Sequence, residues 1–300
     1  MIKKRYLYSS IFCSTLLLSG CLFNDKSEED IIEDKYFVSV QDYTGEGYTL
    51  QSGNDTDKIA EKHKEEVEEA VKAYFKENYQ TEVKVHNIVG AVDGATVFVE
   101  SVGQPHFYSY AIIPVDKDKE EIDPEGVWSQ EGQVETAIVS GLYAWVYEDR
   151  FMELDTFLEG IVQEYPVIGI REEANENVRG NYFLTPYYKV TVYGGRLEEL
   201  LPVYLMNPNK TKEEWKSILG PEPIDPSKIS ITIQMYMEEQ DVDPNEKIFD
   251  TIVEQITEKD GLPSGKYSFL LHDNTIDKTS AQNNKENSLK NGAPDYIVKE

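Results

Sequence analysis

The N-terminal segment constrains this chain most, because it decides which residues can take part in a fold. Met1 is followed by Lys3, Lys4 and Arg5, and an uncharged, largely apolar run then extends from Tyr6 to Leu18. A basic start and an apolar run are the first two regions of a secretory signal peptide. The run is too short for a helix that crosses a bilayer, which needs about 20 residues. We therefore expect residues 1–20 to be an export signal that is removed.

The signal ends in Leu18, Ser19, Gly20 and Cys21, and this tetrapeptide resembles the lipobox of bacterial lipoproteins. The resemblance implies a diacylglyceryl group on the Cys21 thiol, cleavage before Cys21, and acylation of the new amino group with a chain such as palmitate. Two or more acyl chains hold a protein firmly on a membrane, whereas a single chain binds reversibly. We expect the mature protein to be lipid-anchored to the extracytoplasmic face of the cell membrane.

Cysteine chemistry is excluded from the rest of the chain. The other cysteine, Cys13, lies inside the segment that is removed, so the mature chain has no thiol for a disulfide, a metal ligand or a nucleophile. An exported chain of about 280 residues is long enough to bury a stable core without disulfides.

The mature chain is strongly acidic. Removing Lys3, Lys4 and Arg5 from the 29 basic residues leaves 26 against 56 acidic residues, a net charge of −30. Such a charge repels the phosphates of nucleic acids and attracts cations and basic partners. We therefore expect no nucleic-acid partner, and the acidity also keeps an exported domain soluble.

Composition divides the chain into four parts. Residues 1–20 are the signal, residues 21–35 are the lipidated cysteine and an acidic tether, and residues 36–128 and 129–300 are two folded parts that can belong to one domain. The stretch from Asp273 to Ala293 is rich in Asn, Lys, Ser and Thr, and this composition predicts a mobile loop.

The first folded part predicts a helix followed by three strands. Apolar residues recur at helical spacing from Asp55 to Tyr79. Apolar, β-branched and aromatic residues then dominate Glu82–Val89, Ala95–Val102 and His106–Val115, and the short connections between them are rich in turn residues. These segments predict a three-stranded antiparallel meander.

The second folded part mixes helices and strands. A helix is predicted from Val134 to Trp145, and a continuation after a break leads toward Pro166. A short helix is predicted after the capping box that begins at Thr211, and another after the start signal Asp243-Pro244-Asn245-Glu246, with Asp243 as its cap. Strands are predicted at Tyr187–Tyr193, Ile229–Met237 and Lys266–His272. We therefore predict an α+β fold with a mostly antiparallel sheet and packed helices.

Few residues qualify as site residues. The four histidines show no helical ligand spacing, and no cofactor motif or nucleophile motif is present. The acidic runs near Asp116 and Asp241 lack the glycine and glutamate of a calcium loop. His106 stands between a turn and a strand, followed closely by Tyr108, and we predict these two as binding residues. No catalytic residue, metal ligand or cofactor is predicted.

Three segments carry a family resemblance: Tyr43–Tyr48, Val85–Tyr110 around the turn at Asp93-Gly94, and Pro294–Glu300. Through them the chain resembles an uncharacterised family of lipoproteins from Gram-positive bacteria, the DUF1672-like lipoproteins. The resemblance implies that the protein is a lipoprotein located at the cell membrane, and it assigns no functional residue to this chain.

The sequence leaves three functions open. The first is a non-enzymatic surface lipoprotein that binds a partner protein, an envelope component or a cation. The alternatives are the substrate-binding lipoprotein of a transporter, with two lobes around a cleft, and an envelope hydrolase that uses paired carboxylates.

Overall fold

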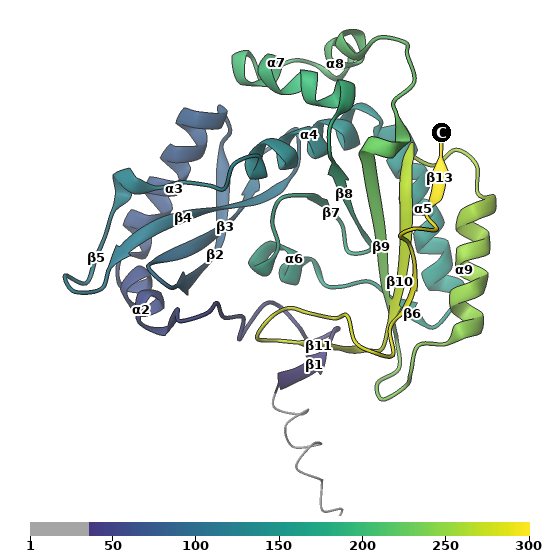
Figure 1. Ribbon diagram of the computed structural model, residues 1–300, viewed down its shortest axis with the longest axis horizontal. Coiled ribbons are helices and arrows are strands. Elements are labelled where there is room, and N and C mark those ends of the chain that lie inside the picture. Colours follow the sequence, from purple (N-terminus) through teal and green to yellow (C-terminus); the bar gives the residue numbers. More distant parts are fainter. Residues whose placement is uncertain (1–35) are drawn as a thin grey trace, which may run out of the picture. The chain divides into compact units, whose positions relative to one another are not determined.

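The computed structural model describes residues 36–300, which form one compact unit. The predicted signal peptide, lipobox and acidic tether lie outside the described residues. Eight α-helices and thirteen strands are present in the described part, and most strand pairs are antiparallel, so the predicted α+β class is confirmed (Figure 1). No helix of residues 36–300 combines the length and the apolar character needed to cross a membrane.

A four-stranded antiparallel sheet follows the two N-terminal helices. Its strands occur in sequence order and confirm the predicted meander, to which the structure adds one short strand. The helix predicted over Asp55–Tyr79 is two helices, because the backbone leaves the helical conformation at His63. The elements are α2 (Asn54–Lys62), α3 (Lys64–Tyr79), β2 (Val83–Ala91), β3 (Gly94–Ser101), β4 (Tyr108–Asp116) and β5 (Glu121–Ile122).

The second sheet contains seven strands and is mixed. Its central pair, β9 and β10, is parallel, and the chain crosses between them through helix α9, as it must because parallel neighbours need a long connection. The strands are β6 (Val167–Ile168), β7 (Phe183–Leu184), β8 (Tyr188–Val192), β9 (Ile229–Met237), β10 (Gly265–His272), β12 (Leu289–Asn291) and β13 (Ile297–Lys299). A separate two-stranded ladder joins β1 (Phe37–Ser39) to β11 (Thr275–Asp277).

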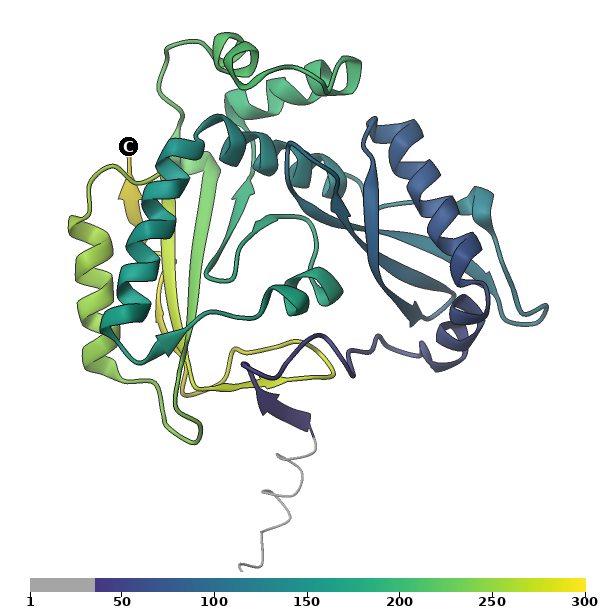
Figure 2. The ribbon, with the colours of Figure 1, turned by 180° about the vertical axis from the view of Figure 1, so that it is seen from behind.

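The remaining helices cover the sheets. Figures 1 and 2 both show α5 and α9 side by side along the seven-stranded sheet, while α7 and α8 lie together at one end of it. Helix α9 begins after Asn245, whose side chain accepts a hydrogen bond from the backbone of Ile248, so the predicted cap at Asp243 is wrong by two residues. The helices are α4 (Gln133–Val146), α5 (Glu148–Glu164), α6 (Glu172–Val178), α7 (Leu200–Met206), α8 (Lys212–Leu219) and α9 (Glu246–Glu258).

Helix α4 joins the two sheets into one core. It contacts β4 of the small sheet and β8 of the large sheet, and its side chains Val134, Ile138 and Leu142 are fully buried. A single continuous cluster of buried apolar residues extends from Ala60 to Leu271 and includes strands of both sheets. The two folded parts therefore share their interior.

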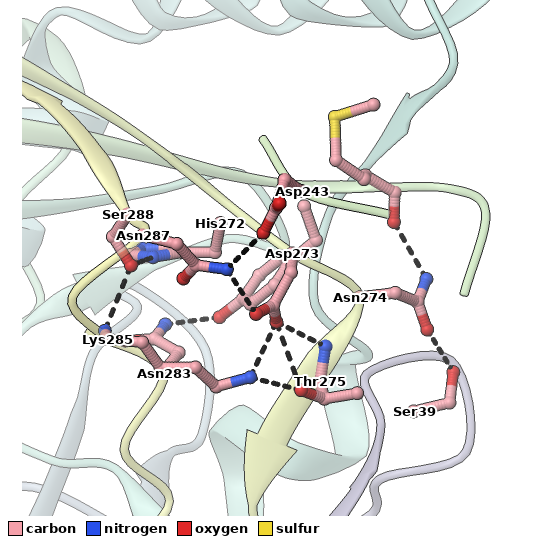
Figure 3. A network of polar contacts seen from close by, with 12 residues as sticks. Ser39, Asp243, His272, Asp273, Asn274, Thr275, Asn283, Lys285, Asn287 and Ser288 are labelled. Carbon is pink, nitrogen blue, oxygen red and sulfur yellow. Dashed lines mark hydrogen bonds and ion pairs between the residues drawn. The ribbon is translucent and has the colours of Figure 1, made fainter. Parts of the chain in front are cut away.

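The segment from Asp273 to Ala293, predicted as a loop, is held by two strands and a polar network (Figure 3). Asp273 accepts hydrogen bonds from the Lys285 ammonium at 2.6 Å, from the backbone and hydroxyl of Thr275, and from Asn287 at 3.1 Å. Asn274 donates to the carbonyl of Met237. Most of the segment is a loop, as predicted, but it also contains two short strands, and side-chain hydrogen bonds hold it where apolar contacts are few.

Candidate functional site

Four polar side chains meet where helix α6 covers the small sheet. They come from separate parts of the chain: His86 from β2, Glu100 from β3, His106 from the loop before β4, and Glu176 from α6. The His86 side chain is only 5% exposed, whereas those of Glu100, Glu176 and His106 are 23 to 29% exposed. The cluster is thus mostly buried but reachable from solvent, and we refer to these four residues as the His–Glu cluster.

A β-bulge places His86 in the cluster. Val85 pairs with Val99 and Asn87 pairs with Phe98, so His86 is an extra residue between two consecutive pairs of the β2–β3 ladder. An extra residue twists its strand locally and redirects its side chain, and bulges are common beside functional sites. The bulge therefore brings the imidazole to Glu100 on the neighbouring strand.

Glu100 bridges the two imidazoles. Its Oε2 lies 2.8 Å from Nε2 of His86, and its Oε1 lies 2.9 Å from Nε2 of His106. Glu176 approaches His86 from the other ring nitrogen, with 3.5 Å between its Oε2 and Nδ1. His86, Glu100 and Glu176 can each offer one ligand atom such that all three atoms lie within 4.8 Å of one another.

The loop that carries His106 is fixed by its own hydrogen bonds. The Ser101 hydroxyl donates to the carbonyl of Pro105 and accepts from the backbone N–H of Phe107. The backbone N–H of His106 donates to the side-chain oxygen of Gln104 at 3.1 Å. These bonds hold the imidazole on Glu100 without help from a ligand.

Tyr108 forms a wall of the cluster. It is 2% exposed, and its ring centroid lies 5.1 Å from that of His106 and 6.4 Å from that of His86. Burial raises the pKa of Tyr108, and the nearby charges of Glu100, Glu172 and Glu176 raise it further. Tyr108 therefore stays neutral, and the negative charge around it belongs to carboxylates.

Glu100 remains ionised despite its burial. Burial raises the pKa of Glu100, but hydrogen bonds from His106 and His86 and the attraction of their charges lower it more, so the pKa lies below its ordinary value. A carboxyl whose pKa is lowered by folding stabilises the fold above its unfolded pKa. This contribution is present at neutral pH and is lost as the pH falls through the folded pKa.

The chemistry of the cluster suits a divalent metal ion. Imidazole nitrogen and carboxylate oxygen are the ligands that zinc takes in proteins, and two carboxylates neutralise its charge. His106 holds Glu100 through the oxygen that faces away from His86, as groups that orient a metal ligand do. The described residues near the cluster contain no cysteine or serine nucleophile paired with these imidazoles.

The two predicted binding residues, His106 and Tyr108, are brought together here. His86, Glu100 and Glu176 were missed. The hairpin turn at Asp93-Gly94 carried a signal for two of them, because it places His86 near Glu100 across the strands. Glu176 had no such signal, since its helix is short and was not predicted.

Other candidates lie elsewhere. His63 contacts Glu66 at 3.4 Å on the helix surface. His272 is fully buried, and burial lowers its pKa to about 4, so it is neutral at pH 7. In the acidic runs, Asp116 accepts from Lys119 and Asp243 accepts from Asn287, so both carboxylates serve local structure.

The geometry defines a class of protein: an α+β domain of two sheets with a shared core and a mostly buried His–Glu cluster. The chain belongs to the family of proteins of unknown function DUF1672, whose family model matches residues 31–299. The fold is similar to the crystal structure of a DUF1672 family protein from Staphylococcus aureus subsp. aureus Mu50, with a TM-score of 0.72 and 18% identity over 88% of this chain and 98% of that chain. No curated protein matches the sequence.

Proposed function

We propose that this protein is a lipid-anchored binding protein of the extracytoplasmic face of the cell membrane, and that its ligand is a divalent metal ion of the zinc type. One observation supports the ligand: His86, Glu100 and Glu176 offer nitrogen and oxygen atoms within 4.8 Å of one another in a mostly buried site. The lipobox-like sequence Leu18–Cys21 supports the proposed lipid anchoring at the membrane.

Zinc would take one ring nitrogen of His86. Because Glu100 contacts Nε2 and Glu176 contacts Nδ1, one of the two carboxylates would have to move around the ring to reach the ion. The 2.8 Å between His86 and Glu100 is a hydrogen-bond distance, and two ligand atoms about 2.1 Å from one zinc lie slightly further apart. A zinc ion bound by His86 and Glu100 would take the place of the proton shared between imidazole and carboxylate, and that proton would be released to solvent. Calcium and magnesium prefer oxygen ligands and fit a histidine site poorly.

The two alternative functions gain no support. A transporter's substrate receptor has two lobes that move on a hinge, whereas the two sheets of residues 36–300 share one continuous core. A hydrolase needs a carboxyl group with a raised pKa beside a substrate cleft, but the pKa of Glu100 is lowered. Burial raises the pKa of Asp155, but this carboxylate lies on α5, outside the His–Glu cluster, and accepts a hydrogen bond from the Tyr188 hydroxyl at 2.8 Å.

Replacing His86 by glutamine is expected to weaken zinc binding by at least about 100-fold, because it removes the buried nitrogen ligand. His63→Gln is the matched control, since His63 also contacts a glutamate, Glu66 at 3.4 Å, but lies outside the His–Glu cluster. The affinity of the detergent-solubilised full chain for zinc is measured by competition with a fluorescent chelator. Equal affinities of the two variants, or no binding by the unmodified chain, contradict the metal proposal.

The anchor is tested independently. Changing Cys21 to serine removes the thiol that carries the lipid, so the protein is expected to leave the membrane fraction and the detergent phase of a two-phase extraction. Cys13→Ser is the matched control, because Cys13 lies within the apolar run and precedes the proposed cleavage. Membrane association that survives in the Cys21→Ser variant rules out lipid anchoring at this residue.

A further inference from the structure

A pocket lies on the large sheet, on the face opposite the core. Along β10, Phe269 points into the core while Ser268 and Leu270 lie on the other face, and the pairing places Thr232 of β9 opposite Ser268 and Lys290 of β12 opposite Leu270. The pocket has a volume of about 410 Å³. Its lining is Thr232, Ser268, Leu270, Lys290–Ala293, Asp295 and Tyr296, and none of these residues belongs to the His–Glu cluster.

The chain between β12 and β13 forms one side of this pocket. It passes close to the sheet at Gly292, where an added Cβ would lie 3.0 Å from the Ser268 hydroxyl. The ammonium of Lys266 lies 5.1 Å from the centre of the Tyr296 ring, so a cation–π contact holds that ring beside the sheet. The pocket is therefore built from regular strands and a segment fixed at both ends, because β13 pairs with β10 again.

The lining presents one positive and one negative charge. Lys290 and Asp295 both line the pocket, and neither forms an ion pair or a side-chain hydrogen bond with any residue that the structure describes. The hydroxyls of Thr232 and Ser268 likewise have no hydrogen-bond partner within residues 36–300. Leu270 and the Tyr296 ring add apolar surface.

We propose that this pocket binds a free α-amino acid with an apolar side chain. Lys290 pairs with the carboxylate, Asp295 pairs with the ammonium, and the Thr232 and Ser268 hydroxyls complete the hydrogen bonds of the two polar groups. Leu270 and Tyr296 contact the side chain. The volume is within the range of small-molecule sites, about 300 to 1,000 Å³. A ligand with only one charge leaves one of the two protein charges without a partner.

The experiment compares L-leucine with two analogues, each of which lacks one of the two charged groups of the amino acid. The melting temperature of the detergent-solubilised full chain is measured against L-leucine, 4-methylpentanoate, which lacks the ammonium, and 3-methylbutylamine, which lacks the carboxylate. Leucine is expected to raise the melting temperature saturably, and each analogue is expected to bind at least about tenfold more weakly. L-valine and L-phenylalanine test other apolar side chains, and no stabilisation by any of the three amino acids overturns the proposal.

Variants then assign each charge. Lys290→Gln is expected to weaken leucine binding about tenfold and to leave 3-methylbutylamine binding unchanged, because that ligand has no carboxylate to lose. Asp295→Asn is expected to weaken leucine binding and to leave 4-methylpentanoate binding unchanged. Lys247→Gln, an exposed lysine on α9 without a side-chain partner, is the matched control. Equal leucine affinities of Lys290→Gln and Lys247→Gln overturn the proposal.

Discussion

Replacing Phe269 by alanine is expected to lower the free energy of unfolding by about 3 to 5 kcal/mol, measured by chemical denaturation. Phe269 lies on the central strand β10 and is 0% exposed. Its ring stacks on that of Phe249 from α9, with 5.4 Å between the centroids. The substitution leaves a cavity between sheet and helix that neither regular element can easily fill. Total stabilities of domains are about 5 to 15 kcal/mol, so this is a large loss.

Tyr193→Ala is the control for this prediction. It also removes an aromatic ring, but Tyr193 is 63% exposed, and the expected change is within about 0.5 kcal/mol. If the two variants lose similar stability, the packing of α9 on β10 does not hold the large sheet as described.

Replacing Gly90 by alanine is expected to cost about 3 kcal/mol or more, because it forces two pieces of backbone apart. An added Cβ at Gly90 would lie 2.2 Å from the carbonyl oxygen of Gly53 and 2.3 Å from the backbone nitrogen of Asp57. Backbone atoms cannot rotate away as a flexible side chain can. The same contact anchors α2 to β2, where the Asp57 carboxylate accepts from the N–H of Gly90 at 2.9 Å.

The same substitution at Gly160 is expected to have the opposite sign. Gly160 lies in helix α5, is exposed, and has no atom within 4 Å of an added Cβ. Alanine there favours the helix by about 0.5 to 1 kcal/mol. Thermal and chemical denaturation of both variants measure the difference, and a stable Gly90→Ala variant contradicts the close contact between α2 and β2.

The spacing of apolar residues predicted those helices and strands that are long enough for the spacing to repeat. The meander of β2, β3 and β4 was predicted because each strand is eight or nine residues long and the turn at Asp93-Gly94 joins two of them. The parallel pair β9 and β10 was not predicted, although a strand, a helix and a strand follow one another there. Parallel pairing depends on which strands become neighbours, and contacts distant in sequence decide this.

The short elements escaped prediction for a different reason. Strands such as β6 and β7 have two residues each, and their conformation comes from the strand beside them. The ordered segment after Asp273 depends on side-chain hydrogen bonds that composition does not reveal. Some join residues 14 positions apart, as between Asn287 and Asp273, and others join residues 37 positions apart, as between Asn274 and Met237.

The candidate site shows the same limit. His106 and Tyr108 were predicted because a turn-to-strand junction displays its residues. The cluster itself requires a bulge at His86 and a helix that brings Glu176 over the sheet, and both are tertiary features. Searching for ligands along a single helix could not find a site whose members face one another across strands.

Zinc binding at the His–Glu cluster can be tested by anomalous X-ray diffraction at the zinc edge, from crystals of the protein grown or soaked with zinc chloride. We expect one strong anomalous peak about 2.0 to 2.2 Å from a nitrogen of His86 and from an oxygen each of Glu100 and Glu176, with His106 still hydrogen-bonded to Glu100. Peaks found only among exposed carboxylates, with His86 still hydrogen-bonded to Glu100, would contradict it.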